Sequence, residues 1–186
     1  SAASDVYKRQ VTVGSFDGVH LGHRALLERL VGEARRRNAE SVVLTFEPHP
    51  RVTLGRDEGL RLLTTLEEKT ALLAASGVDA LVVIPFDRSF STLSGAEFLD
   101  RYLIGKIGAE TLVVGYNHRF GHDRADCRKL AEERGLWLVC VDERSVGGEH
   151  VSSTVIRNLL ACGRQDEAER LAGHALRPGN ESNDLP

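Results

Sequence analysis

Two histidines beside a glycine-rich turn have the spacing that points most clearly to chemistry. The segment Gly14–His23 ends in His20, Gly22 and His23, at the point where a short β-branched strand gives way to a helical pattern. The first N–H groups of a helix lack partners and its dipole favours anions, so phosphates are the natural ligands. A lone histidine pair at this spacing is more often a set of helix caps, but the glycines and the strand-to-helix setting favour phosphate binding.

A second segment, Val151–Arg157, brings hydroxyls and a cation to the start of another helix. Ser153 and Thr154 are typical of an N-cap. Arg157 lies about one turn into the helix, and helical side chains lean toward the N-terminus, so its guanidinium can reach an anion held there. Neither His20 nor His23 has a sequence neighbour that would make it a nucleophile or base. We therefore assign the histidines to stabilising charge during in-line phosphoryl transfer.

A third segment, Gly115–Gly121, mixes donors, acceptors and aromatic rings, as binding loops do. His118 and His122 with Asp123 could suggest a metal site, but an intervening glycine breaks the spacing and no zinc pattern is completed. We therefore predict no metal site made of protein side chains.

Apolar runs alternating with helical patterns predict the elements that position these segments. Strands are expected over 11–15, 41–46, 80–84, 111–114 and 136–141, and helices after residue 20 and over 65–77, 94–104, 126–134, 153–161 and 165–172. The strands are continuous apolar runs, which is typical of a parallel sheet covered on both faces. The prediction is a Rossmann-like α/β fold with a five-stranded, mainly parallel sheet. Ligands bind such sheets at the carboxyl ends of the strands, where all three segments lie.

Composition bounds the partners and the compartment. The 186 residues suit one domain, and 24 Lys and Arg against 27 Asp and Glu give a net charge of -3, which argues against a nucleic-acid binder. No apolar run approaches the ~18 residues of a membrane span, and no secretion signal is evident, so we expect a cytoplasmic protein without a membrane partner. The three cysteines lack paired spacing and predict free thiols.

Together the three segments resemble the N-terminal FMN adenylyltransferase module of the bacterial bifunctional riboflavin kinase/FAD synthetase family, within the nucleotidylyltransferase superfamily. The histidine segment is similar to the superfamily's His-x-Gly-His signature, and residues 153–157 to its second signature. The flavin branch is indicated by intervening stretches in the same order: 44–50, 63–69, 85–90 and 115–121. The resemblance implies transfer of AMP from ATP to FMN, giving FAD and pyrophosphate, with Mg²⁺ accompanying ATP mainly on its phosphates.

The resemblance also implies roles for individual residues. The catalytic residues it implies are His20, His23, Arg157 and Asn117. The ATP-binding residues it implies are Gly14, Ser15, Phe16, Asp17, Gly22, Ser153 and Thr154. The FMN-binding residues it implies are Pro48, His49, Pro50, Asn117 and Arg119.

The chain departs from the family pattern in ways that leave two alternatives open. Many relatives carry an acidic and an aromatic residue at Asn117 and His118, and the stretch from Gly121 to Leu136 is several residues shorter here. The alternatives are a nucleotidylyltransferase for another phosphorylated acceptor, such as phosphopantetheine, nicotinate mononucleotide or a glycerol phosphate, and a binding module without turnover. Residues 1–10 are expected to be a leader, 11–177 the adenylyltransferase domain and 178–186 a polar tail. The riboflavin kinase module normally fused to this domain is expected to be absent, so the chain should not phosphorylate riboflavin.

Overall fold

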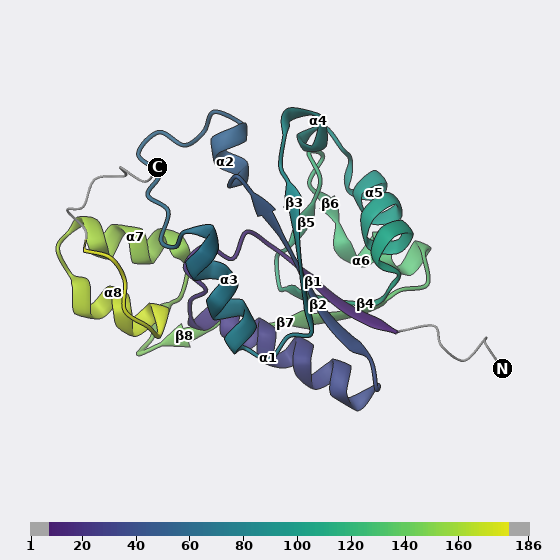
Figure 1. Cartoon of the computed structure of the whole chain (residues 1–186), viewed down its shortest axis with the longest axis horizontal. Helices are drawn as coiled ribbons and strands as arrows, with labels where there is room; N and C mark the ends of the chain where they lie inside the picture. The colour runs from purple at the N-terminus through teal and green to yellow at the C-terminus, as the bar shows by residue number, and fades with distance from the viewer. Residues whose placement is uncertain (1–7, 179–186) are drawn as a thin grey trace.

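A five-stranded sheet forms the centre of the molecule, which the computed structural model describes over residues 8–178. Its strands are β1 (Arg9–Val13), β2 (Glu40–Glu47), β3 (Ala80–Pro85), β4 (Ala109–Gly115) and β7 (Trp137–Val141). They lie in the order β3-β2-β1-β4-β7, and every neighbouring pair is parallel (Figure 1). The predicted α/β fold with a five-stranded parallel sheet is confirmed.

Helices connect the strands, and several begin at the predicted caps. They are α1 (Leu21–Arg36), α2 (Pro50–Thr53), α3 (Leu66–Ala75), α4 (Arg88–Ser91), α5 (Gly95–Phe98), the π-helix η2 (Leu99–Ile107), α6 (Cys127–Glu133), α7 (Ser153–Ala161) and α8 (Gln165–Ala172). Thr65 with Glu68 and Ser94 with Glu97 form the expected capping boxes, in which each pair closes two unpaired backbone donors. The last two helices have the predicted bounds.

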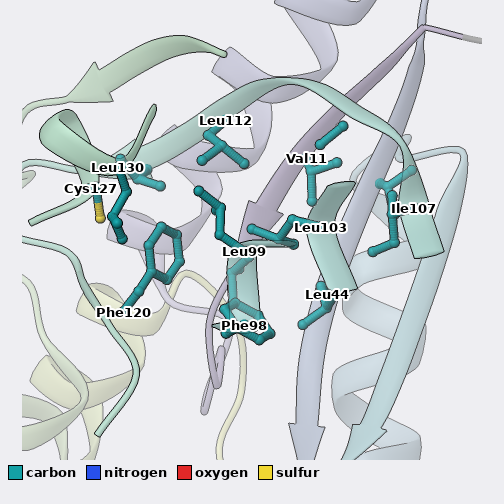
Figure 2. Close-up of a cluster of buried hydrophobic side chains, with 14 of the residues drawn as sticks. Val11, Leu44, Phe98, Leu99, Leu103, Ile107, Leu112, Phe120, Cys127 and Leu130 are labelled. Atoms are coloured by element: carbon teal, nitrogen blue, oxygen red, sulfur yellow. The ribbon is translucent and has the colours of Figure 1, made fainter. Parts of the chain in front are cut away.

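Helices cover both faces of the sheet. On one face, Leu27 and Leu30 of α1 and Leu73 of α3 pack on Val43 and Val113. The opposite face carries a larger cluster, shown in Figure 2, that includes Val11, Leu44, Phe98, Leu99, Leu103, Ile107, Leu112, Phe120 and Leu130. Burying each large apolar side chain contributes roughly 1.5–3 kcal/mol, so the two layers stabilise the sheet that carries the loops.

The strand order reverses beside β1. The chain moves outward from β1 to β2 and β3, and then returns to the other side of β1 for β4 and β7. At such a reversal, the connections leave the carboxyl ends of neighbouring strands in opposite directions and open a crevice between them. The loops after β1 and β4 therefore border the crevice, as expected for two of the three sequence segments.

Two small hairpins were not predicted. One pairs β5 (Arg119–Phe120) with β6 (Ala125–Asp126), and the other pairs β8 (Ser145–Val146) with β9 (Glu149–His150). Strands of two residues are too short to produce a readable period in a sequence. The predicted helix over 94–104 also differs in detail, because its second part is a π-helix that runs to Ile107.

The expected leader over residues 1–10 is wrong for its last residues. Arg9 and Gln10 belong to β1, where Gln10 is fully buried. Arg9 pairs with Glu40 on β2 at 3.1 Å and donates to the carbonyl of Ile107 at 2.6 Å. These polar side chains made the strand start hard to recognise, since their partners are far away in sequence. Residues 1–7 and 179–186, and so most of the leader and tail assignments, lie outside the described residues.

A helical hairpin of α7 and α8 packs beside the start of α1. Its apolar residues form one cluster with Leu63 and Val151. After α8, His174 donates from Nε2 to the carbonyl of Gly18 at 2.6 Å. The hairpin and the residues that follow it thus contact and support the β1–α1 loop. Within residues 8–178, no helix has both the length and the apolar character needed to cross a membrane.

Candidate active site

The loop between β1 and α1 takes an unusual backbone path. Phe16 and Val19 adopt φ of 50° and 38°, a region that side chains with a Cβ rarely enter. Gly14 donates to the carbonyl of Leu44 at 3.0 Å, and Gly18 donates to Thr64 Oγ1 at 3.0 Å. Such strain persists only where the surroundings hold it, and it gathers at functional sites.

His20 and His23 form a capping box made of two imidazoles. His20 is the N-cap of α1, and its Nδ1 accepts from the His23 N–H at 3.2 Å. The His20 N–H in turn donates to Nδ1 of His23 at 3.2 Å. The rings stack with their centroids 3.5 Å apart and 16° between their planes. A neutral imidazole that accepts at Nδ1 carries its proton on Nε2, so each ring keeps one N–H donor for a ligand.

Both histidines are neutral at physiological pH. Burial, with smaller effects from His150, Arg157 and His174, lowers the pKa of His20 to about 4. Burial is also the main reason that the pKa of His23 lies well below its usual value. The sequence assigned these residues to stabilising the charge of phosphates, and this role stays a prediction; a neutral imidazole with its proton on Nε2 can fill it as a hydrogen-bond donor.

Gly22 lets the His20 ring lie against the helix. A Cβ at this position would lie 3.0 Å from Cε1 of His20 and 3.4 Å from the carbonyl oxygen of Val151. With any side chain at this position, the imidazole would have to shift by a few tenths of an ångström. The glycine between the two histidines is explained by this close approach.

Arg157 is held by a buried carboxylate instead of pointing freely outward. Its Nη2 lies 2.5 Å from Oδ2 of Asp17, and its Nε donates to the carbonyl of Arg61 at 2.7 Å. The Asp17 carboxylate also accepts from the N–H groups of Leu63 (3.0 Å) and Thr64 (3.2 Å). Asp17 thus ties α7 and the chain before α3 to the β1–α1 loop. Two donor groups of Arg157 are engaged, which leaves Nη1 for a ligand.

These residues surround a cavity of about 360 Å³ at the carboxyl ends of β1, β4 and β7. We call it the nucleotide cavity, after the ligand that the resemblance of the sequence implies. The sequence-predicted residues that line it are Gly14, Ser15, Phe16, Asp17, His20, Gly22, His23, His49, Ser153 and Arg157. The histidine segment and the second signature are 130 residues apart in sequence, and the fold brings them to one cavity. The Ser153 hydroxyl itself donates to the Asp17 carbonyl at 2.8 Å, and Ser152 is the N-cap of α7.

A second cavity of about 390 Å³, which we call the aromatic cavity, adjoins the first. Its shared walls are Val13, Gly14, Ser15 and His118. The aromatic side chains that line it are Phe46, Phe86, Phe90, Phe98 and Phe120. Its charged residues are Arg56, Arg119 and Arg124, all exposed, and no carboxylate lines it. The predicted residues Pro50 and Arg119 lie here.

Three predicted residues line neither cavity. Asn117 and Thr154 are exposed, and so is Pro48, which follows Glu47 through a cis peptide bond. In the loop after β4, the nucleotide cavity is lined by Tyr116 and His118, the two residues on either side of Asn117. Burial lowers the pKa of His118 to about 4, so this imidazole is neutral.

Sequence reasoning did not identify several residues at the site. The basic residues it missed are Arg56, Lys69, Arg124, Arg144 and His150. They lie in short elements or loops without a recognisable motif, so only the fold places them. For the residues described, no group of three His, Cys, Asp or Glu side chains is arranged to hold a metal ion.

The sequence profile of the FAD synthetase family matches residues 3–155 of the chain. A bifunctional riboflavin kinase/FMN adenylyltransferase from Escherichia coli (strain K12) is 38% identical over 168 residues, which are 88% of this chain and 54% of that protein. The protein of the same name from Listeria monocytogenes is 35% identical over 169 residues, 88% of this chain and 53% of that protein. The chain spans about half the length of these two relatives.

Two further similarities cover most of the chain. A relative from Geobacillus thermodenitrificans is 34% identical over 170 residues, which are 89% of this chain and 90% of that protein. A crystal structure of a protein described as a macrolide-efflux protein from Streptococcus pneumoniae has a TM-score of 0.82 at 27% identity, over 91% of this chain and 56% of that one. The chain therefore belongs to the FAD synthetase family.

Proposed function

We propose that the chain transfers the adenylyl group of ATP to FMN, giving FAD and pyrophosphate. The observation that carries this proposal is that two cavities share a wall, formed by Val13, Gly14, Ser15 and His118. One is lined by the paired histidines at the start of α1, and the other by five phenylalanines with three arginines. A reaction that joins a nucleoside triphosphate to a phosphorylated aromatic molecule needs two such cavities side by side.

On the donor side, His20 and His23 bind the phosphates of ATP through Nε2. They donate alongside the free N–H groups at the start of α1, whose dipole favours negative charge. Arg157, through Nη1, and the start of α7 contact the triphosphate from the other wall. Because these donors are already in place, they stabilise the charge of the transition state with little reorganisation.

On the acceptor side, the flavin ring lies among the phenylalanines and its phosphate points toward the nucleotide cavity. The phosphate oxygen of FMN attacks the α-phosphorus of ATP, a new P–O bond forms, and the bond to the bridging oxygen of pyrophosphate breaks. A phosphate dianion is already a nucleophile, so the step needs positioning more than it needs a base. The arginines and the lack of carboxylates suit an acceptor with negative charge.

Magnesium enters with ATP as part of the substrate. The carboxylates that line the nucleotide cavity are Asp17, Asp142 and Glu143, and Asp17 is already held by Arg157 and backbone donors. This donor set fits an ion carried mainly by phosphates and water, which is the usual manner of Mg²⁺. A cytoplasmic location, where ATP and FMN are found, is part of the same proposal.

The test is to incubate the purified chain with ATP, magnesium and FMN and to follow FAD and pyrophosphate by chromatography. We expect both products in equal amounts, and none with riboflavin, which lacks the attacking phosphate. Phosphopantetheine and nicotinate mononucleotide are tested as alternative acceptors. If either reacted faster than FMN, that molecule and not FMN would be the preferred acceptor. FMN binding without FAD would indicate a binding module, and no flavin binding would overturn the proposal.

A further inference from the structure

Lys69 is a buried lysine whose charge is directed at the active-site loop. It lies on α3 and is 6% exposed. Its Nζ donates to the carbonyl of Ser15 at 3.0 Å, to Thr45 Oγ1 at 3.2 Å and to the carbonyl of Phe46 at 3.4 Å. An ammonium group has three N–H donors, and these three acceptors use all of them.

Burying the charged ammonium group of Lys69 costs free energy, so we expect the charge to have a function at this position. Burial lowers the pKa of Lys69, although Glu47 and Asp17 favour its charged form. Lysine is among the residues least often buried, and an apolar side chain would fill the same space without losing hydration. The reason for the lysine should therefore lie in what its three hydrogen bonds hold.

The residue it holds is one of the four that line both the nucleotide cavity and the aromatic cavity. Ser15 lines the nucleotide cavity, the aromatic cavity and a third cavity of about 430 Å³ that Lys69 itself borders. Thr45 Oγ1 also donates to the Ser15 carbonyl at 3.2 Å. Lys69 thus ties α3, the carboxyl end of β2 and the β1–α1 loop together at one oxygen atom.

We propose that Lys69 is a positioning residue for adenylyl transfer. By holding Ser15 against β2, it fixes the nucleotide cavity and the aromatic cavity relative to each other. The inference rests on the proposed function. Each substrate has many other contacts for binding, whereas transfer depends on the mutual position of two phosphates. A displacement of ~1 Å between reacting groups lowers a rate by about 100-fold. Loss of Lys69 should therefore lower kcat and leave both KM values nearly unchanged.

The test compares Lys69→Met, which keeps most of the length of the side chain but has no donor, with Lys69→Arg, which keeps a charged donor. Lys129→Met is the matched control, because Lys129 is an exposed lysine on α6. We expect Lys69→Met to lower kcat about 100-fold with both KM values within about threefold. Lys69→Arg should recover most of this loss, and Lys129→Met should behave as the wild type.

A second measurement does not depend on activity. Amide hydrogen exchange of residues 14–17 should be about tenfold faster in Lys69→Met than in the wild type, while exchange in α6 stays the same. If the wild type makes no FAD, the proposed function fails, and the exchange measurement still decides whether Lys69 holds the loop.

The inference would be overturned by a Lys69→Met protein that keeps its kcat, or that loses rate only through raised KM values. It would also be overturned if Lys69→Arg lost as much kcat as Lys69→Met. Unchanged amide hydrogen exchange of residues 14–17 in Lys69→Met would overturn it as well.

Discussion

His20 and His23 each cap the backbone of the other through Nδ1, with their rings stacked at 3.5 Å. Helix capping and phosphate binding are usually considered competing explanations for histidines at a helix start. Here capping uses Nδ1, and the proposed phosphate contact would use Nε2 of the same ring, because a neutral imidazole that accepts at Nδ1 donates at Nε2. The two roles can therefore be separated by substitution.

Replacement of His20 by asparagine should keep the cap and remove the phosphate donor. Asparagine is among the best N-cap residues, whereas alanine costs about 1 kcal/mol of stability at that position. We expect both His20→Asn and His20→Ala to lower kcat by about 100- to 1,000-fold, as the loss of a transition-state donor does. Only His20→Ala should lower the free energy of unfolding in urea. Wild-type turnover by His20→Asn would show that the imidazole is only a cap.

The buried histidines should make the fold sensitive to acid. The pKa of His20 is about 4 in the folded protein against an ordinary value of 6.5, so the unfolded chain binds its proton first. The stabilisation is complete above the ordinary value and is lost as the pH falls from there toward 4. His20 alone should account for roughly 3 kcal/mol across this range. Urea unfolding at several pH values should show a steep decline in the wild type and a shallower one in His20→Asn; equal slopes would exclude His20 as the cause.

The pair of Asp17 and Arg157 should be strongly coupled. Both side chains are largely buried, and removal of one partner from a buried ion pair lowers stability by about 3–5 kcal/mol. Arg157→Met and Asp17→Asn should each destabilise the protein, and the double variant should lose less than their sum, with a coupling energy of about 1–3 kcal/mol. Arg157→Met should also lack activity, both as a single variant and together with Asp17→Asn. Additive losses in a double-mutant cycle would mean that the two residues act independently.

Gly22 offers a test of ring placement that does not weaken the helix. In Gly22→Ala the new Cβ would lie 3.0 Å from the His20 ring, so the ring must shift. Alanine is intrinsically better than glycine in a helix by up to about 1 kcal/mol, which offsets the cost of these tight contacts, so the melting temperature should change little. We expect kcat to fall by about tenfold or more, because the Nε2 donor is displaced.

Gly32→Ala is the control for this variant, since Gly32 lies on the same helix and a Cβ there would meet nothing within 4 Å. It should keep wild-type turnover. Equal activity of the two variants would indicate that the His20 ring tolerates displacement.

The sequence predicted the sheet, the main helices and the signature residues because each has a local signal. Apolar runs mark the strands, capping boxes mark α3 and α5, and the two signatures have fixed spacing. The start of β1 was missed because Gln10 is a buried polar residue that resembles a leader when only its neighbours in sequence are considered.

The rest of the site depends on contacts between distant segments. Lys69 resembles any lysine near a helix start, and its role becomes visible only through its hydrogen bonds to Ser15 and Phe46. Likewise, no periodic pattern in the sequence shows which side chains of a loop face a cavity. For this reason the structure places Tyr116 and His118 at the nucleotide cavity and leaves Asn117 exposed, so its catalytic role stays a prediction.

The α7–α8 hairpin also decides where a working unit can end. The family profile matches the chain to residue 155, but Arg157 lies beyond that point, and so does His174, which donates to the Gly18 carbonyl. A fragment cut at the last matched residue would end inside α7, without the arginine and without the support behind the β1–α1 loop. Truncations meant to preserve activity should therefore keep the chain through α8 and His174.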